Sequence, residues 1–308
     1  MQEIYQKTLT KIISFTGIGL HSGKSAKVKL FPADENHGIV FKRTDLDKNN
    51  LIKANFANVT SARLCTTLEN NHGAKVSTVE HLLAALYIIG IDNALIEIDN
   101  EEVPIMDGSS KDFIDILEKI DLVNQSKKRK YLKISDKIEL IDNDRKIAIE
   151  PNNTSLEVDF QLNYENKIIG KQKNKIDFQK DNLDEVCSSR TFCLFEDIEK
   201  IKKSGLAKGG SLNNAVVVDK DKVLNEGGLR NKKEFVNHKI LDLAGDFLLS
   251  GYRIIGKVSC YQGGHELTNL FLRKIFNTKE SFKLIEPNSF EVTKKFQTKE
   301  LDKIAVNA

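Results

Sequence analysis

His238 and Asp242, two side chains that commonly bind metal ions, occur four residues apart in the sequence. The surrounding stretch, 234–249, has an apolar stripe at helical spacing, which predicts a helix. Residues i and i+4 of a helix project from the same face, so an imidazole and a carboxylate placed in this way can bind one metal ion. An isolated pair of this kind is more often a solvated polar face, so further ligands are needed.

Glu80 and His81 add two polar groups at the start of a strongly apolar stretch. All eight residues from 82 to 89 are apolar, which predicts a helix over 78–89 that is buried on most sides. Polar groups at the head of a buried helix need partners. A structural explanation exists for each: Glu80 could bind back to the Ser77 backbone in a capping box, and His81 could be a core histidine held by a hydrogen bond.

The three candidate ligands together describe an open zinc site. His81, His238 and Asp242 supply two imidazoles and one carboxylate, and three protein ligands with a free fourth position are typical of catalytic zinc. Glu80 adjoins one of these ligands and could take a proton from an attacking water. The pattern therefore predicts a metal site with a general base beside it.

Two further side chains could support this chemistry. His265 follows Gly263 and Gly264 directly after a predicted strand, so it is well placed to enter a cleft. Lys239 adjoins His238 and could stabilise negative charge on a substrate.

Three other motifs do not fit their patterns. Residues 17–25 (GIGLHSGKS) are similar to a phosphate-binding loop, but Ile18 stands where that loop needs glycine, so a tight hairpin turn is the better prediction. His265 begins a sequence like that of a zincin helix, but Asn269 replaces the second histidine ligand. The Gly-x-Ser-x-Gly motif of serine hydrolases does not occur.

Composition bounds the kind of protein that must hold these residues. The chain has 308 residues, a formal net charge of +3 and 40% hydrophobic residues, which predicts two globular domains. The nearly balanced charge, with far more lysine than arginine, argues against a dedicated nucleic-acid-binding protein. The four cysteines form no Cys-x-x-Cys pair, which excludes a cysteine-based zinc finger and fits a reducing compartment.

The sequence also lacks the signals of export or membrane insertion. Residues 1–11 have no apolar core of a signal peptide, and the longest apolar run, 82–91, is too short to span a bilayer. We therefore expect a cytoplasmic protein without a stable membrane anchor.

Strands and helices alternate in a way that predicts an α+β fold. In the first half we predict strands at 11–15, 26–31, 38–42 and 94–98, and helices at 78–89 and 111–120. In the second half we predict strands at 131–140, 146–149, 156–162, 215–218 and 252–261, and helices at 181–187, 195–204, 234–249 and 266–276. Each half contains a helix, a glycine and then an apolar strand, which hints at two similar α+β modules.

The basic segment 126–130 (SKKRK) is the predicted linker between these modules. The predicted domains are therefore 1–126, with Glu80 and His81, and 127–278, with His238, Asp242 and His265. The remaining residues, 279–308, are rich in Lys, Glu, Asn and Gln and are predicted to be a weakly structured tail.

The order and spacing of ten short motifs resemble those of the UDP-3-O-acyl-N-acetylglucosamine deacetylases, a family of zinc amidases that catalyse the committed step of lipid A biosynthesis. The matching segments are GIGLHSG (17–23), LCT (64–66), STVEHLLAA (77–85), GIDN (90–93), PIMDGSS (104–110), SRTF (189–192), GLAKGG (205–210), VLNEGGLR (223–230), HKILDLAGD (238–246) and GH (264–265). Each motif is unspecific alone, but together they are highly specific.

This resemblance implies a role for each candidate side chain. The implied ligands of one catalytic Zn²⁺ ion are His81, His238 and Asp242. Glu80 would be the general base, and His265, oriented by Asp246, the general acid or an electrostatic stabiliser. The implied substrate-binding residues are Leu64, Thr191, Phe192, Gly210 and Lys239. Of these, Thr191 and Lys239 would also help to hold the oxyanion.

The implied fold has two similar α+β domains, each with a sheet, a helix pair and a small insert, and an active site between them. The second insert, 194–224, would form an apolar passage for an acyl chain, and the suitable apolar residues there are Leu206, Ala207, Ala215 and Val217. The chain departs from its relatives at Gln262, where a lysine near the nucleotide phosphates is common. It also has Asn163 and Tyr164 in place of an Asp-Phe pair near the uracil.

The implied reaction hydrolyses the N-acetyl group of UDP-3-O-acyl-N-acetylglucosamine to give acetate and UDP-3-O-acyl-glucosamine. The resemblance implies a cytoplasmic monomer of a Gram-negative-type bacterium, which binds no nucleic acid and approaches the inner membrane only transiently. The changes at Gln262 and Asn163 leave open a zinc amidase that acts on another acylated amino sugar. A non-enzymatic nucleotide-binding module built on 17–25 is the third interpretation.

Overall fold

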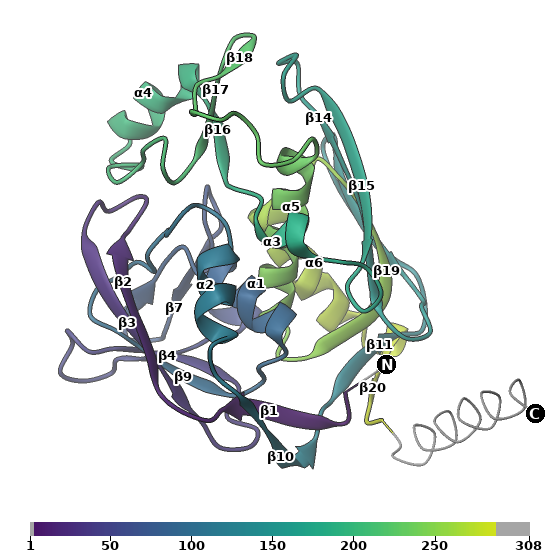
Figure 1. The fold of residues 1–308 in the computed structure, drawn as a ribbon. Helices are drawn as coiled ribbons and strands as arrows, with labels where there is room; N and C mark the ends of the chain where they lie inside the picture. Colours follow the sequence, from purple (N-terminus) through teal and green to yellow (C-terminus); the bar gives the residue numbers. More distant parts are fainter. Residues whose placement is uncertain (1–2, 288–308) are drawn as a thin grey trace, which may run out of the picture.

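A five-stranded sheet forms the base of the N-terminal half in the computed structural model, which describes residues 3–287 (Figure 1). In sheet order its strands are β2 (Ile13–Ile18), β3 (Ser25–Pro32), β9 (Ala94–Ile98), β4 (Ile39–Arg43) and β5 (Leu51–Lys53). Only β4 and β9 run parallel. Along β3 the side chains of Ala26, Val28 and Leu30 are buried while Lys27 is exposed, so one face of the sheet packs on the core.

Two helices and three short strands complete this half. The helices are α1 (Glu80–Ile89) and α2 (Lys111–Leu117), and the turn η1 (Phe56–Asn58) precedes the short strands. These strands form an antiparallel sheet of β6 (Val59–Ser61), β7 (Thr67–Glu69) and β8 (Lys75–Val76). The first eight residues of α1 are all buried, as the apolar run that follows Glu80 and His81 predicts.

A seven-stranded sheet organises the C-terminal half. Its strands are β11 (Tyr131–Ile134), β12 (Ile138–Asp142), β13 (Arg145–Glu150), β14 (Leu156–Asn163), β15 (Lys171–Asp177), β19 (Arg253–Tyr261) and β20 (Phe282–Ile285). The long strand β19 is central, because it pairs with β11, β13 and β14. The helices of this half are α3 (Asp184–Cys187), α5 (Glu234–Leu248) and α6 (His265–Asn277).

A small insert stands apart from the two main sheets, at the top of Figure 1. It consists of β16 (Phe192–Leu194), α4 (Phe195–Lys203), β17 (Val216–Asp219) and β18 (Lys222–Val223). The three strands form their own sheet, in which β16 and β17 are parallel. The insert lies within the predicted range 194–224 apart from the first residues of β16.

The two halves meet at α1 and α5, which lie together at the centre of the molecule (Figure 1). Gly245 of α5 faces the first turn of α1, and a Cβ atom at this position would overlap the carbonyl oxygen of Glu80. A glycine is therefore required for the backbones of the two helices to approach this closely.

The hairpin predicted for residues 17–25 is confirmed. The loop connects β2 with β3, and it is closed by hydrogen bonds from Gly19 N to Lys24 O (2.9 Å) and from Gly23 N to Gly19 O (3.0 Å).

The predicted linker is wrong in its first part. Ser126 to Lys128 end a strand, β10 (Leu122–Lys128), which pairs antiparallel with β1 (Tyr5–Leu9). Polar side chains are tolerated there because this two-stranded sheet has both of its strands at an edge. The partner strand comes from the beginning of the chain, so local composition could not reveal the pairing.

The beginning of the predicted tail is ordered as well. Residues 279–281 form the turn η2 (Lys279–Ser281), and β20 pairs antiparallel with β11 at the edge of the large sheet. The apolar side chains Phe282 and Leu284 are too few to stand out among polar neighbours. The rest of the predicted tail, from residue 288 onward, lies outside the described residues. None of the helices within 3–287 has the length and apolar character needed to cross a membrane.

Candidate metal centre and active site

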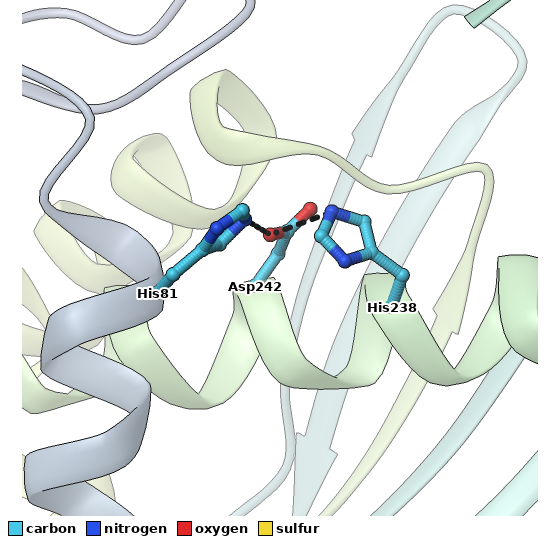
Figure 2. A group of neighbouring side chains, drawn as sticks. All are labelled: His81, His238 and Asp242. Carbon is cyan, nitrogen blue, oxygen red and sulfur yellow. Dashed lines mark ion pairs between the residues drawn. The ribbon is translucent and has the colours of Figure 1, made fainter. Parts of the chain in front are cut away.

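The helices α1 and α5 bring the three predicted ligands together. His81 comes from α1, and His238 and Asp242 come from successive turns of α5; the three side chains point toward one another (Figure 2). Oδ1 of Asp242 lies 3.5 Å from Nε2 of His81 and 3.3 Å from Nε2 of His238. All three side chains are buried, and one ligand atom from each lies within 4.8 Å of the others.

This arrangement fits a metal ion. Within residues 3–287, no group donates a hydrogen bond to the buried Oδ1 of Asp242, although two imidazole nitrogens face it. A tetrahedral zinc site with bonds of about 2.0–2.1 Å places two ligand atoms about 3.3 Å apart. The observed separations between oxygen and nitrogen therefore suit ligands that share one ion.

Neighbouring groups keep the ligands in the right protonation state and orientation. Nδ1 of His238 lies 3.1 Å from the Ser189 carbonyl oxygen, to which it can donate, and this leaves Nε2 free for a metal. Burial lowers the pKa of His238 to about 3, so its imidazole is neutral at physiological pH. Burial raises the pKa of Asp242, but neighbouring cations, Lys239 and His265 among them, outweigh burial and hold the pKa well below its usual range.

Glu80 is the first residue of α1, and its buried carboxylate faces the metal centre. Oε2 accepts a hydrogen bond from Thr66 N (3.0 Å), and Oε1 lies 3.7 Å from Nε2 of His265. The capping box is therefore not formed, since Glu80 binds Thr66 and the hydroxyl of Ser77 donates to Glu101 O. Burial raises the pKa of Glu80, which suits a group that must hold a proton during a reaction.

His265 and Asp246 form a buried pair next to Glu80. Nδ1 of His265 lies 2.8 Å from Oδ2 of Asp246, whose Oδ1 accepts a hydrogen bond from Thr66 Oγ1 (2.7 Å). Burial lowers the pKa of His265, but the carboxylates of Asp246 and Glu80 outweigh burial and raise the pKa to about 10. The structure thus places the predicted acid close to the predicted base.

Thr66 is a site residue to which the sequence analysis assigned no role of its own. Its backbone N–H holds Glu80 and its hydroxyl holds Asp246, so one residue fixes both carboxylates. The segment 64–66 is part of a matching motif, but a lone threonine on a loop gave no signal of this double contact.

The remaining predicted residues surround an apolar groove of about 360 Å³ beside the metal centre. Leu64, Thr191, Phe192 and Gly210 line this groove. The ring centroid of Phe192 lies 5.7 Å from Nζ of Lys239, which in turn donates to Oδ2 of Asp242 (2.9 Å). The groove therefore opens toward Lys239, which contacts the predicted metal ligand Asp242.

The insert supplies much of this groove, as predicted. Ala207, Ala215 and Val217 line it, whereas Leu206, which is half-buried in the described structure, lies outside the lining. Further apolar residues of the insert also face the groove, among them Phe195, Ile198, Ile201, Leu212 and Leu224.

Two of the three positions that depart from the family pattern, Asn163 and Gln262, contact each other. Asn163 N donates to Oε1 of Gln262 (2.8 Å), and Nε2 of Gln262 donates to Asn163 O (2.6 Å). The side chain of Asn163 donates to the Tyr261 hydroxyl (3.2 Å). The Gln262 amide is therefore engaged with the end of β14.

Two histidines and one aspartate around a free position, with a buried carboxylate and imidazole beside them, are typical of metal-dependent hydrolases. Comparison with known proteins agrees with this class. The family model described as UDP-3-O-acyl N-acetylglycosamine deacetylase matches residues 6–277, and the chain belongs to this family.

Relatives named UDP-3-O-acyl-N-acetylglucosamine deacetylase match nearly the whole chain. The protein from Pseudoalteromonas translucida is 39% identical over 282 residues, covering 91% of this chain and 93% of its own. The protein from Shewanella violacea is 40% identical over 94% of both chains. The protein from Pasteurella multocida is 41% identical, covering 92% of this chain and 93% of its own.

Proposed function

We propose that this chain hydrolyses the N-acetyl group of UDP-3-O-acyl-N-acetylglucosamine, releasing acetate and UDP-3-O-acyl-glucosamine for lipid A biosynthesis. The observation that carries the proposal is the buried group of His81, His238 and Asp242 with Glu80 and His265 beside it. Family membership over residues 6–277 supports the same activity.

The residues of the chain divide the work of amide hydrolysis. His81, His238 and Asp242 would hold one Zn²⁺ ion, which supplies Lewis-acid chemistry and lowers the pKa of water to about 7. Glu80 takes a proton from the attacking water, and its raised pKa lets it retain that proton. His265 stays protonated beside Asp246, so it can donate to the departing amine or stabilise negative charge.

Substrate binding follows from the groove and its rim. The apolar groove accepts the acyl chain, and Phe192 packs against the sugar at the end of the groove nearest to His238. Lys239 and Thr191 help to hold the oxyanion that develops on the carbonyl oxygen, because positioned donors stabilise such charge. Leu64 and Gly210 shape the groove wall.

The proposal extends to the organisation of the chain. Domains 1–126 and 127–278 each contribute part of the active site, and the protein acts as a cytoplasmic monomer that contacts the inner membrane only transiently. Size measurement in solution tests the monomer, and vesicle sedimentation at low and high salt tests the membrane contact.

Metal removal and restoration test the proposed chemistry. Treatment of the protein with a chelator should abolish acetate release, and re-addition of about one equivalent of Zn²⁺ should restore it, on the three-ligand site described above. Full activity in metal-free protein would overturn the proposal. Wild-type protein carried through the same steps with the chelator omitted is the control.

A zinc amidase with a different acylated amino-sugar substrate is the second candidate. The observation that favours it is the residue at position 262, because this glutamine offers no cation to a nucleotide phosphate and its amide is engaged with Asn163. A substrate panel that varies the nucleotide and the acyl chain separates the two candidates. Highest kcat/KM on the UDP-linked monoacylated sugar supports the first candidate.

A further inference from the structure

The buried carboxylate of Glu102 joins two segments that lie on different sides of the active site. It is only 2% exposed, and it accepts hydrogen bonds from His21 N (2.7 Å), Ser22 N (2.6 Å) and Thr78 Oγ1 (2.9 Å). The first two donors belong to the loop between β2 and β3. The third donor lies just before α1, so one side chain holds both segments.

Thr78 has a backbone conformation that its side chain disfavours. Its φ angle is +55°, in the left-handed region, where a β-branched residue is a genuine outlier. Such a conformation persists only where the surroundings hold it in place. Thr78 lies two residues before Glu80 and three before His81, so its conformation sets the direction in which both side chains leave the chain.

The other contacts of Glu102 reach the groove. Leu20 and His21 line it, and Glu102 fixes the backbone of His21 and Ser22. A Cβ atom on Gly19 would overlap Oε2 of Glu102, so the loop is packed tightly on this carboxylate. One carboxylate thus connects the groove wall to the turn that carries the base and a metal ligand.

We propose that Glu102 is a positioning residue for the deacetylation reaction. It holds Thr78 in the left-handed conformation, so that Glu80 and His81 point at the metal centre, and it holds the loop that forms one wall of the acyl groove. This role rests on the proposed function, but it also predicts metal affinity, which is measured without any substrate.

Glu102→Met tests the role directly, because a side chain of similar length without oxygen acceptors loses the hydrogen bonds from His21, Ser22 and Thr78 together. We expect kcat to fall by about tenfold or more, on the order of what release of a strained conformation of this kind produces. We also expect weaker Zn²⁺ binding by the metal-free protein in competition with a chromophoric chelator, and a raised KM. Glu101→Met is the matched control, since the side chain of Glu101 is exposed and pairs with Lys24 (3.4 Å).

Changes at Thr78 separate the contact between Glu102 and Thr78 from the contact between Glu102 and the loop that connects β2 with β3. Thr78→Val keeps the shape and the loop contacts but removes the donor to Glu102, so kcat and Zn²⁺ affinity should fall while KM stays unchanged. Glycine adopts φ +55° without strain. In the Glu102→Met background, Thr78→Gly should therefore restore kcat and Zn²⁺ affinity and leave KM raised, because the loop is still released.

Equal kcat and equal Zn²⁺ affinity in Glu102→Met and the wild type would overturn the proposal. Failure of Thr78→Gly to restore either quantity would also overturn it, since a general loss of structure is not repaired by a glycine. If Glu102→Met does not fold, Thr78→Val alone decides, because it should lower kcat while KM stays unchanged. A wild-type chain without deacetylase activity would contradict the proposed function, while the Zn²⁺ affinities would still report on Glu102.

Discussion

The proposed base and the proposed acid are held through one shared residue. Thr66 donates from its backbone to Glu80 and from its hydroxyl to Asp246, and Asp246 in turn holds His265. The relative positions of the proposed base and the proposed acid are therefore fixed through Thr66. This arrangement is what general acid–base catalysis requires, because proton transfer needs groups within hydrogen-bond reach of the reacting atoms.

Glu80→Gln should separate metal binding from turnover. The amide keeps the shape of the side chain but cannot take a proton, so kcat should fall by about 10²- to 10⁴-fold. The zinc content should stay at the wild-type level, because Glu80 is not one of the three clustered ligands. Steady-state kinetics and metal analysis provide the check.

The control for this change is Glu97→Gln, since Glu97 pairs with Lys42 (2.9 Å) on the outer side of the N-terminal sheet. Activity of Glu80→Gln equal to that of the control would refute the assignment of Glu80 as the base.

Among the helices and strands, α1 matters most for the geometry of the site, because contacts hold it at both ends. At its C-terminal end Arg253, the first residue of β19, donates to the carbonyl oxygens of Leu86 and Ile91 (both 3.2 Å) and also contacts the Tyr87 carbonyl. The Leu86 carbonyl oxygen also accepts from Gly90 N (3.1 Å), and Ile91 lies just beyond the helix, so the guanidinium adds donors to the carbonyls at this end. Since β19 leads at its other end to the loop before His265, α1, which carries the proposed base, is tied to the strand that leads to the proposed acid.

Gly245→Ala should disturb this arrangement at the contact between α1 and α5. The added Cβ would overlap the Glu80 carbonyl oxygen, and overpacking of this kind costs about 1–3 kcal/mol. We expect a lower free energy of unfolding in urea and a lower kcat, because the first turn of α1 must move away from α5. Unchanged stability together with unchanged kcat would show that the two helices can separate without cost.

In the whole molecule, contacts between the halves keep the divided site assembled. Asp107, which precedes α2, binds Arg230, which precedes α5, with 2.6 Å between Oδ2 and Nη1. Arg230 also donates to Ser188 O (2.9 Å), just before the segment that reaches the groove. The contact therefore joins the N-terminal half to the segments that position α5 and the insert.

The pH dependence of stability should reveal this ion pair. Burial raises the pKa of Asp107, but Arg230 and Ser109 outweigh burial and lower the pKa below its ordinary value. The stabilisation is therefore complete above the pKa of the unfolded chain, about 3.9, and is lost as the pH falls through the folded pKa. Asp107→Asn should lower the urea midpoint at pH 7, and the deficit should shrink below about pH 4.

Urea unfolding at several pH values provides the measurement. Asp115→Asn, which removes an exposed ion pair with Lys111 (2.7 Å), should change the midpoint little at any pH. A deficit for Asp107→Asn that is constant down to pH 3 would contradict the assignment.

Local sequence was sufficient for much of the fold. The apolar residues predicted α1 and α5, and the glycines predicted the hairpin between β2 and β3. The insert was predicted from the family resemblance. The pairing of β1 with β10 and of β11 with β20 could not be predicted, because each joins segments that are far apart in the chain and have polar or unremarkable composition.

The types and spacing of residues alone determined which side chains could hold a metal and which could move protons. Only the tertiary structure decided that His81 from α1 meets His238 and Asp242 from α5, that Glu80 binds Thr66 instead of capping its own helix, and that Glu102 reaches both Thr78 and the groove loop. Hydrogen bonds and ligand geometry depend on distances of a few ångströms between segments remote in sequence. Periodicity describes one segment at a time, so those distances are set only when the two halves pack together.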